Sequence, residues 1–164
     1  MRLAGAALAS TLLLLAACGA KESLISKPAE VPEGVDLSGN WLLRDTTGST
    51  QRGARETLVH VFLETGKSVK VTQTASGLFV SFDRSVVEEY RFGEHREVSV
   101  GEISAERVSG WEGRAYVIET LDDNGAKLTD SYQLSNDGAV LSRRIAIWSR
   151  DSKQMSLAQV FDRI

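Results

Sequence analysis

Short runs in which apolar and polar residues alternate, separated by turn-forming residues, fill the chain from Leu37 to Ile164. A period of two predicts half-buried β-strands, and apolar stretches with the helical period of 3.6 are scarce. We therefore predict an all-β domain over residues 37–164. The expected strands are 39–44, 57–64, 68–74, 78–83, 86–92, 97–102, 106–111, 114–121, 127–134, 140–148 and 155–163.

Turn-forming tetrapeptides separate the last four of these strands. Asp122-Asp123-Asn124-Gly125 and Ser135-Asn136-Asp137-Gly138 each contain a glycine directly after Asn or Asp. That pair supplies the positive φ angles of a tight hairpin at low steric cost. Arg150-Asp151-Ser152-Lys153 makes a third turn. Connections this short exclude parallel βαβ crossovers, so the last four strands are predicted to form an antiparallel meander.

The number of strands limits the architecture. An open sheet of so many short strands would leave two exposed edges, which small domains avoid by closing the sheet. We predict an antiparallel up-and-down β-barrel of about 8–10 strands, with a β-sandwich as the alternative. Side chains just fill an eight-stranded barrel or leave room for one small ligand, whereas a ten-stranded barrel has more space.

The first 36 residues differ in composition from the rest. Arg2 precedes an uncharged run, residues 3–17, that is rich in Leu and Ala. A bilayer span needs roughly 20 apolar residues, so this run has the length of a signal-peptide core instead. Residues 19–36 are polar and aperiodic and contain both prolines of the chain. A segment with so little apolar surface is predicted to be a flexible tether.

The apolar run ends Leu15-Ala16-Ala17-Cys18, and Cys18 is the only cysteine. This end resembles the lipobox of bacterial lipoproteins, in which a leucine and two small residues precede the cysteine that is lipidated and becomes the mature N-terminus. The resemblance implies several acyl chains on Cys18, which together anchor a protein stably. Gly19 follows the cysteine, and in that family a residue other than Asp favours the outer membrane. An ordinary secretory signal, or a short uncleaved anchor, is the alternative.

These expectations divide the chain into three parts. The signal peptide covers residues 1–17, the lipidated N-terminus and its tether cover residues 18–36, and the β-barrel domain covers residues 37–164.

Composition and charge exclude several classes of function. The formal net charge is −3, and this acidic balance argues against a nucleic-acid partner, which a basic face would bind. Lipidation of the single cysteine would exclude thiol catalysis and thiolate metal sites. The sequence contains no Walker loop, no Gly-x-Ser-x-Gly elbow and no His-Glu-x-x-His motif. We therefore expect no catalytic residues, no metal and no cofactor.

Gly39-Asn40-Trp41 opens the first expected strand. It resembles the Gly-x-Trp motif of lipocalins and related calycin barrels, in which the tryptophan closes the barrel floor and an arginine near the last strand packs over it. The resemblance makes Arg163 the expected partner of Trp41. A guanidinium over an indole is worth about 0.5–2 kcal/mol. The alternative is that Trp41 is an ordinary core residue.

Aromatic and polar side chains on consecutive strands of the meander are the candidate ligand site. Ligand pockets combine apolar and aromatic walls with a few polar groups. The alternative is that these side chains fill the core, or form cross-strand pairs outside the barrel. The candidates are Trp111, Tyr116, Tyr132, Arg144 and Trp148.

The sequence therefore predicts a lipid-anchored β-barrel protein of the bacterial cell envelope, on the outer membrane and facing the periplasm. Its expected function is to bind a small, partly apolar ligand. The alternative is an envelope interaction, structural or inhibitor protein, with a packed core and an envelope protein as its partner. A large interior cavity would favour the first function, and a filled interior would favour the second.

Overall fold

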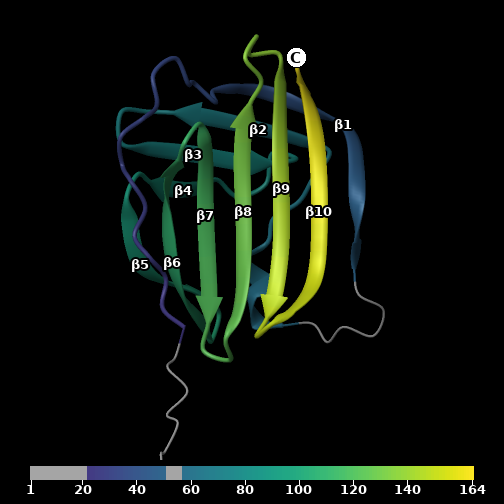
Figure 1. Cartoon of the computed structure of the whole chain (residues 1–164). Coiled ribbons are helices and arrows are strands. Elements are labelled where there is room, and N and C mark those ends of the chain that lie inside the picture. Colours follow the sequence, from purple (N-terminus) through teal and green to yellow (C-terminus); the bar gives the residue numbers. More distant parts are fainter. Residues whose placement is uncertain (1–21, 51–56) are drawn as a thin grey trace, which may run out of the picture.

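The computed structural model describes residues 22–50 and 57–164, and within them one antiparallel sheet winds into a nearly closed barrel (Figure 1). The predicted up-and-down barrel is confirmed. The order of the strands in the sheet is β4-β3-β2-β1-β10-β9-β8-β7-β6-β5. The described part of the chain contains no helix with the length and hydropathy of a membrane span. The strands are β1 (Gly39–Thr50), β2 (Ser68–Gln73), β3 (Gly77–Phe82), β4 (Glu88–Arg91), β5 (Glu94–Val100), β6 (Ile103–Glu112), β7 (Ala115–Asp122), β8 (Ala126–Leu134), β9 (Val140–Ser149) and β10 (Ser152–Arg163).

The predicted meander is present from β7 to β10, and its hairpins have the expected turn chemistry. Gly125 and Gly138 have φ angles of +80° and +71°, which glycine adopts without steric cost. In the β7–β8 hairpin, Oδ1 of Asp122 accepts the backbone N–H groups of Asn124 and Ala126, both at 2.9 Å. Turn residues therefore fix the register of this half of the sheet.

The predicted strand over residues 57–64 is wrong, because Leu58–Phe62 forms a 3₁₀ helix, η1. The Thr57 amide donates to Nδ1 of His60 at 3.0 Å, which helps to start the helix. Val59 and Phe62, three residues apart, are buried, whereas Leu58 and Val61 are exposed. Four apolar residues out of five do not distinguish a period of three from a period of two. Beside η1, the barrel end is filled by Ala105, Ala126, Leu128, Ile145, Ile147 and Met155.

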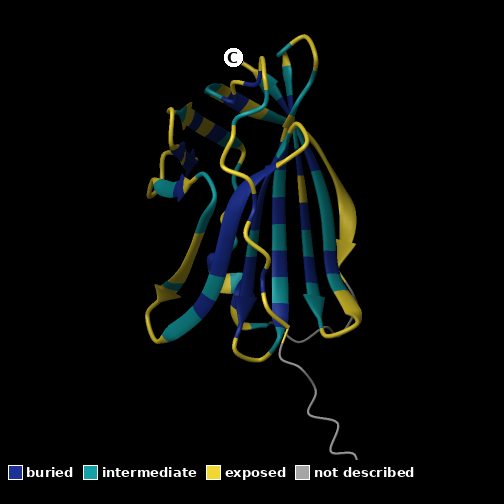
Figure 2. Ribbon diagram, turned by 60° about the vertical axis from the view of Figure 1, so that its left-hand side comes forward, coloured by how far each residue is buried: buried dark blue, intermediate teal, exposed yellow. Residues whose placement is uncertain are grey.

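Residues 22–36, here called the strap, pack against the barrel, and residues 22–28 lie along the outer face of β6 and β7 (Figure 2). This corrects the prediction of a flexible tether for this part of the chain. Leu24 is buried with Val108 of β6 and Leu121 of β7. The backbone N–H of Trp111 donates to the carbonyl oxygen of Pro28 at 2.9 Å. Backbone contacts of this kind leave no periodic signal in the sequence.

A buried lysine and a glycine hold the strap close to the barrel. Lys27 is only 9% exposed, and its Nζ lies 2.5 Å from Oε1 of Glu112 and 3.0 Å from Oε2 of Glu119. Burial alone would lower the pKa of Lys27, but the two carboxylates outweigh this effect and raise it. A Cβ atom on Gly110 would lie 2.4 Å from the carbonyl oxygen of Pro28. The strap therefore depends on glycine at this position.

The barrel end opposite η1 is closed around Trp41, which is fully buried. The guanidinium carbon of Arg163 lies 4.2 Å from the centroid of the Trp41 ring. Nε of Arg163 donates to the carbonyl oxygen of Gly138 at 2.8 Å, and Nη1 donates to that of Ser38 at 2.7 Å. Arg163 thus connects the last strand to the β8–β9 turn and to the start of β1.

We expect the indole–guanidinium contact to appear as a coupling energy between Trp41 and Arg163. In a double-mutant cycle with Trp41→Leu and Arg163→Gln, the coupling should be about 0.5–1 kcal/mol, measured by urea unfolding. The matched control is Arg44→Gln, because Arg44 forms an exposed ion pair with Asp162 at 3.1 Å. Its coupling with Trp41 should be close to zero. A Trp41–Arg163 coupling energy as small as that of the control pair would contradict a stabilising contact between the indole and the guanidinium.

Candidate functional site

The residues that face the barrel interior are identified by the register of the sheet. Residues directly paired on antiparallel strands point to the same face. Successive pairing from β6 to β10 connects five such residues, and all five are buried. This interior row is Trp111, Tyr116, Tyr132, Arg143 and Gln159.

Two of the five predicted ligand-site residues lie outside the barrel. Arg144 is exposed, and Trp148 is half-buried on the outer face, where Nζ of Lys153 lies 4.8 Å from the centroid of its ring. The prediction placed Arg144 in the lining, but Arg143 is the interior arginine. The alternation of residues along β9 indicates that Arg143 faces inward, because it shares a face with the apolar residues Leu141 and Ile145.

Arg143 is 1% exposed and forms the centre of a polar layer in the interior. Its Nε and Nη2 donate to the two carboxylate oxygens of Asp130 at 2.9 and 2.7 Å. Nη1 donates to Gln159 at 3.3 Å, and Nη2 also donates to the carbonyl oxygen of Glu64 at 2.8 Å. The Tyr132 hydroxyl donates to Oδ2 of Asp130 at 3.0 Å. The guanidinium therefore makes four hydrogen bonds to protein groups, two of them to Asp130.

The charge of Arg143 is maintained by its partner. Burial alone would lower the pKa of Arg143, but the Asp130 carboxylate outweighs this effect and raises it. The guanidinium carbon also lies 4.4 Å from the centroid of the Phe82 ring. Sequence analysis missed Asp130, although it alternates with Leu128 and Tyr132 on an otherwise apolar face.

A second buried arginine, Arg107, is paired with a partly exposed carboxylate. Its Nε donates to the hydroxyl of Thr120 at 3.1 Å, and its Nη1 forms an ion pair with Glu88. The guanidinium carbon lies 5.4 Å from the ring centroid of Tyr90 and 5.5 Å from that of Phe62. Arg107 thus joins β6 to β4 across the edge where the barrel closes without a strand pair.

An aromatic cluster lies at one end of the interior row. The ring centroids of Phe92, Trp111 and Tyr116 are 5.2 to 5.5 Å apart, with tilted or edge-to-face orientations. Trp111 and Tyr116 are 2% and 0% exposed. Nε1 of Trp111 and the hydroxyl of Tyr116 have no hydrogen-bond partner among the described residues. The neighbouring Ser109 hydroxyl lies close enough to Tyr116 to lower the pKa of that residue, though by less than burial raises it, and it donates its own proton to the carbonyl oxygen of Arg91 at 3.0 Å.

These two unpaired groups are hydrogen-bond donors. Burial raises the pKa of Tyr116, so its hydroxyl keeps its proton at neutral pH. A buried polar group without a partner costs about 1–3 kcal/mol. A hydrogen-bond acceptor placed beside Trp111 and Tyr116 would remove that cost.

The histidines and acidic residues of the described chain offer no alternative centre. No three His, Cys, Asp or Glu side chains within residues 22–50 and 57–164 gather closely enough to hold a metal ion. Nε2 of His95 contacts the Glu106 carboxylate, and its Nδ1 lies 3.2 Å from the Ser26 hydroxyl of the strap. Both contacts lie on the outside of the barrel, away from the interior row. The predicted lipidation residue, Cys18, lies outside the described residues.

No protein-family model and no curated protein matches the sequence. Solved structures do match. The chain has the calycin-like β-barrel fold. One match is the fatty acid-binding protein in brain tissue of Drosophila melanogaster, with a TM-score of 0.52, 12% identity, and coverage of 77% of this chain and 99% of that one. Another is secretory abundant heat soluble protein 4 from Ramazzottius varieornatus, with a TM-score of 0.51, 12% identity, and coverage of 87% and 99%. A fatty acid transporter matches with a TM-score of 0.50, 10% identity, and coverage of 78% and 96%.

We expect the interior ion pair to behave as a unit. Arg143→Met should lower the free energy of unfolding by about 3–5 kcal/mol, because it leaves the Asp130 carboxylate buried without a counter-charge. The double variant Asp130→Leu/Arg143→Met should lose less than Arg143→Met alone, as measured by urea unfolding. Arg144→Met, on the outer face, is the matched control and should change stability by no more than about 0.5 kcal/mol. If the losses in free energy of unfolding of the two single variants add up to that of the double variant, Asp130 and Arg143 do not act as a unit.

Proposed function

We propose that the chain binds a small, uncharged and largely apolar molecule that carries a hydrogen-bond acceptor, such as a carbonyl or ether oxygen, inside its barrel. The observation that carries this proposal is the pair of buried donors, Trp111 Nε1 and the Tyr116 hydroxyl, which lack an acceptor within the described chain. The apolar part of the ligand would lie against the aromatic rings of this cluster, which form the kind of wall that ligand sites use.

The interior charges favour an uncharged ligand over an anionic one. Arg143 and Arg107 are each paired with a carboxylate, Asp130 and Glu88. An anionic head group would have to compete with one of these carboxylates, and displacing Asp130 would leave that carboxylate buried without a counter-charge, which is strongly unfavourable. A neutral acceptor would leave both ion pairs intact.

Two of the structural matches support binding of an apolar molecule, because they are named as a fatty acid-binding protein and a fatty acid transporter. We further propose binding rather than catalysis. The interior carboxylates Asp130 and Glu88 are engaged by arginines, so neither is placed to act as a general base. The proposed site of action is the periplasmic face of the outer membrane, with the protein anchored through acyl chains on Cys18.

A second candidate function is supported by the filling of the interior. Apolar clusters occupy both ends of the barrel, around Trp41 at one end and around η1 at the other, and the arginine layer lies between them. A solid barrel would bind an envelope protein partner through its outer surface. The exposed apolar residues Val86 and Val87, between β3 and β4, would belong to such a contact.

Native mass spectrometry of the protein extracted in mild detergent tests the ligand. We expect a bound neutral molecule that Trp111→Phe and Tyr116→Phe each release, with affinity falling about ten-fold per lost hydrogen bond. Trp148→Phe, on the outer face, is the matched control and should retain the ligand. Mass spectra without a bound molecule, and no binding of added neutral lipids, would contradict ligand binding and favour the packed-core function.

The anchor is tested separately. Cys18→Ala should leave the protein without acyl chains and move it from the membrane fraction to the soluble fraction, because one thiol would carry the whole attachment. Intact-mass measurement and fractionation provide the two readouts. A variant that stays in the membrane fraction with an unchanged N-terminus would show that the anchor is not at Cys18.

A further inference from the structure

We propose that the barrel stands on the membrane with its η1 end toward the lipid surface, and that the strap fixes this orientation. The η1 end consists of η1 and the β5–β6, β7–β8 and β9–β10 hairpins, which lie together at the lower end in Figure 1. The inference rests on the proposed lipidation of Cys18. It goes beyond the anchor because it specifies which surface of the barrel meets the bilayer.

The strap runs the length of the barrel along β6 and β7, and its contacts define the direction. Pro28 lies beside Trp111, near the β6–β7 turn. Leu24 packs farther down, on Val108 and Leu121. Glu22 forms an ion pair with Lys127, the second residue of β8, directly after the β7–β8 hairpin. The strap therefore reaches the η1 end at Glu22.

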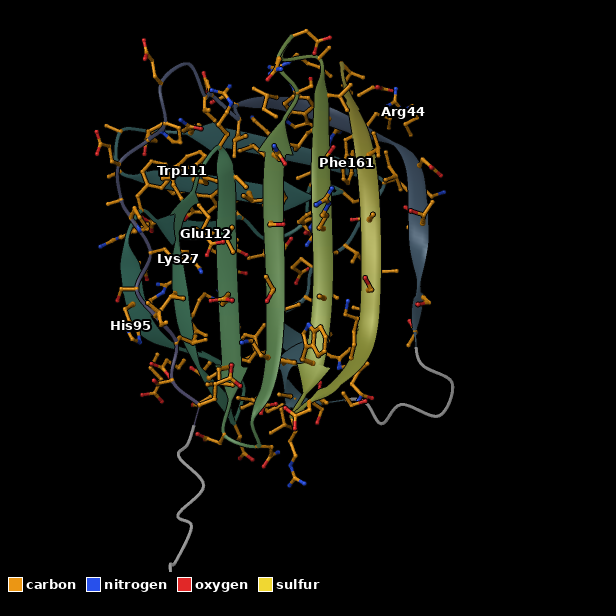
Figure 3. The ribbon with its side chains drawn as sticks, viewed as in Figure 1. Lys27, Arg44, His95, Trp111, Glu112 and Phe161 are labelled. Atoms are coloured by element: carbon orange, nitrogen blue, oxygen red, sulfur yellow. The ribbon has the colours of Figure 1, made fainter. Side chains whose placement is uncertain are left out.

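The contacts that hold the strap are of several kinds, so its path is well defined. Lys27 pairs with Glu112 and Glu119, and it lies beside Glu112 on the outer face (Figure 3). Ala29 lies so close to Gly93 that a Cβ atom there would meet the Ala29 Cβ at 2.9 Å. At the other end of the strap, Nε2 of Gln73 donates to the carbonyl oxygen of Val35 at 3.0 Å.

Chain geometry then places the anchor. Cys18 precedes Glu22 by four residues, so their Cα atoms are at most about 14 Å apart. A strand of ten residues is roughly 33 Å long, which is more than twice that distance. The acyl chains must therefore enter the bilayer nearer to the η1 end than to the Trp41 end.

The surface of the η1 end suits contact with lipid. Leu58 and Val61 of η1 are 37% and 40% exposed, and Val100 in the β5–β6 hairpin is 47% exposed. Apolar side chains on a surface held next to a bilayer partition into its interface. The occupant of this surface is therefore the lipid headgroup region and not a second protein.

Depth measurements on the full acylated protein test the orientation. Because Cys18 is acylated in the proposed mature protein, Val61→Cys, Val100→Cys and Asn136→Cys each offer one thiol for a fluorescent label. Asn136 lies in the β8–β9 turn at the far end and is the matched control. In phosphatidylethanolamine–phosphatidylglycerol vesicles containing nitroxide lipids, labels at 61 and 100 should be quenched at least three-fold more than the label at 136.

Releasing the strap should abolish the difference. Gly110→Ala places a Cβ atom against the Pro28 carbonyl oxygen. Lys27→Gln weakens the strap independently, because it removes the buried charge that pairs with Glu112. Both should bring the quenching at 61 and 136 to within two-fold, while the protein stays on the vesicles. Lys70→Gln, which removes an exposed lysine of β2, is the matched control for Lys27→Gln and should preserve the difference.

The outcomes separate this inference from the proposed anchor. Absence of acyl chains in the intact mass would contradict the anchor itself. Acylated, vesicle-bound protein with equal quenching at 61, 100 and 136, or with more at 136, would overturn the orientation while leaving the anchor intact.

Discussion

The buried pair of Arg143 and Asp130 constrains the rest of the interior. A guanidinium that is 1% exposed is tolerated because both oxygens of one carboxylate bind it and because Gln159 and the Glu64 carbonyl accept two further hydrogen bonds from it. These contacts join β8, β9 and β10 to the segment that follows η1. Both oxygens of Asp130 already bind this guanidinium, so an anion could pair with Arg143 only by competing with Asp130, and this is why we propose a neutral ligand.

The polar layer also explains why the interior divides into two apolar ends. Trp41 and its neighbours fill one end, and Val59 and Phe62 of η1 fill the other. Between them, Arg107 and Arg143 stack on aromatic rings, which shield their charges from the apolar clusters. The unpaired donors of Trp111 and Tyr116 lie outside this balanced layer. They are the polar groups of the interior row that the proposed ligand would satisfy without breaking an ion pair.

Sequence patterns predicted the features that depend on local chemistry. The Asn-Gly and Asp-Gly turns specified the hairpins from β7 to β10, and alternation predicted most strands. Three features depended on information outside a single segment. The helical period of η1 is hidden in an almost uniformly apolar pentapeptide. Identifying Arg143 and not Arg144 as the interior arginine required knowing which face of β9 points inward. The strap is held by backbone hydrogen bonds and the buried Lys27, and it packs closely where Gly110 has no side chain.

The most direct test of this account compares a neutral and an anionic ligand that share the same acyl chain. Methyl dodecanoate carries an ester acceptor, whereas dodecanoate is an anion at pH 7.5, and both have the same apolar chain. Calorimetric titration of the purified barrel should show the ester binding at least about ten-fold more tightly, because the anion must compete with Asp130 or Glu88 for an arginine. Tighter binding of dodecanoate would show that an interior arginine is available to an anion, and would contradict the account.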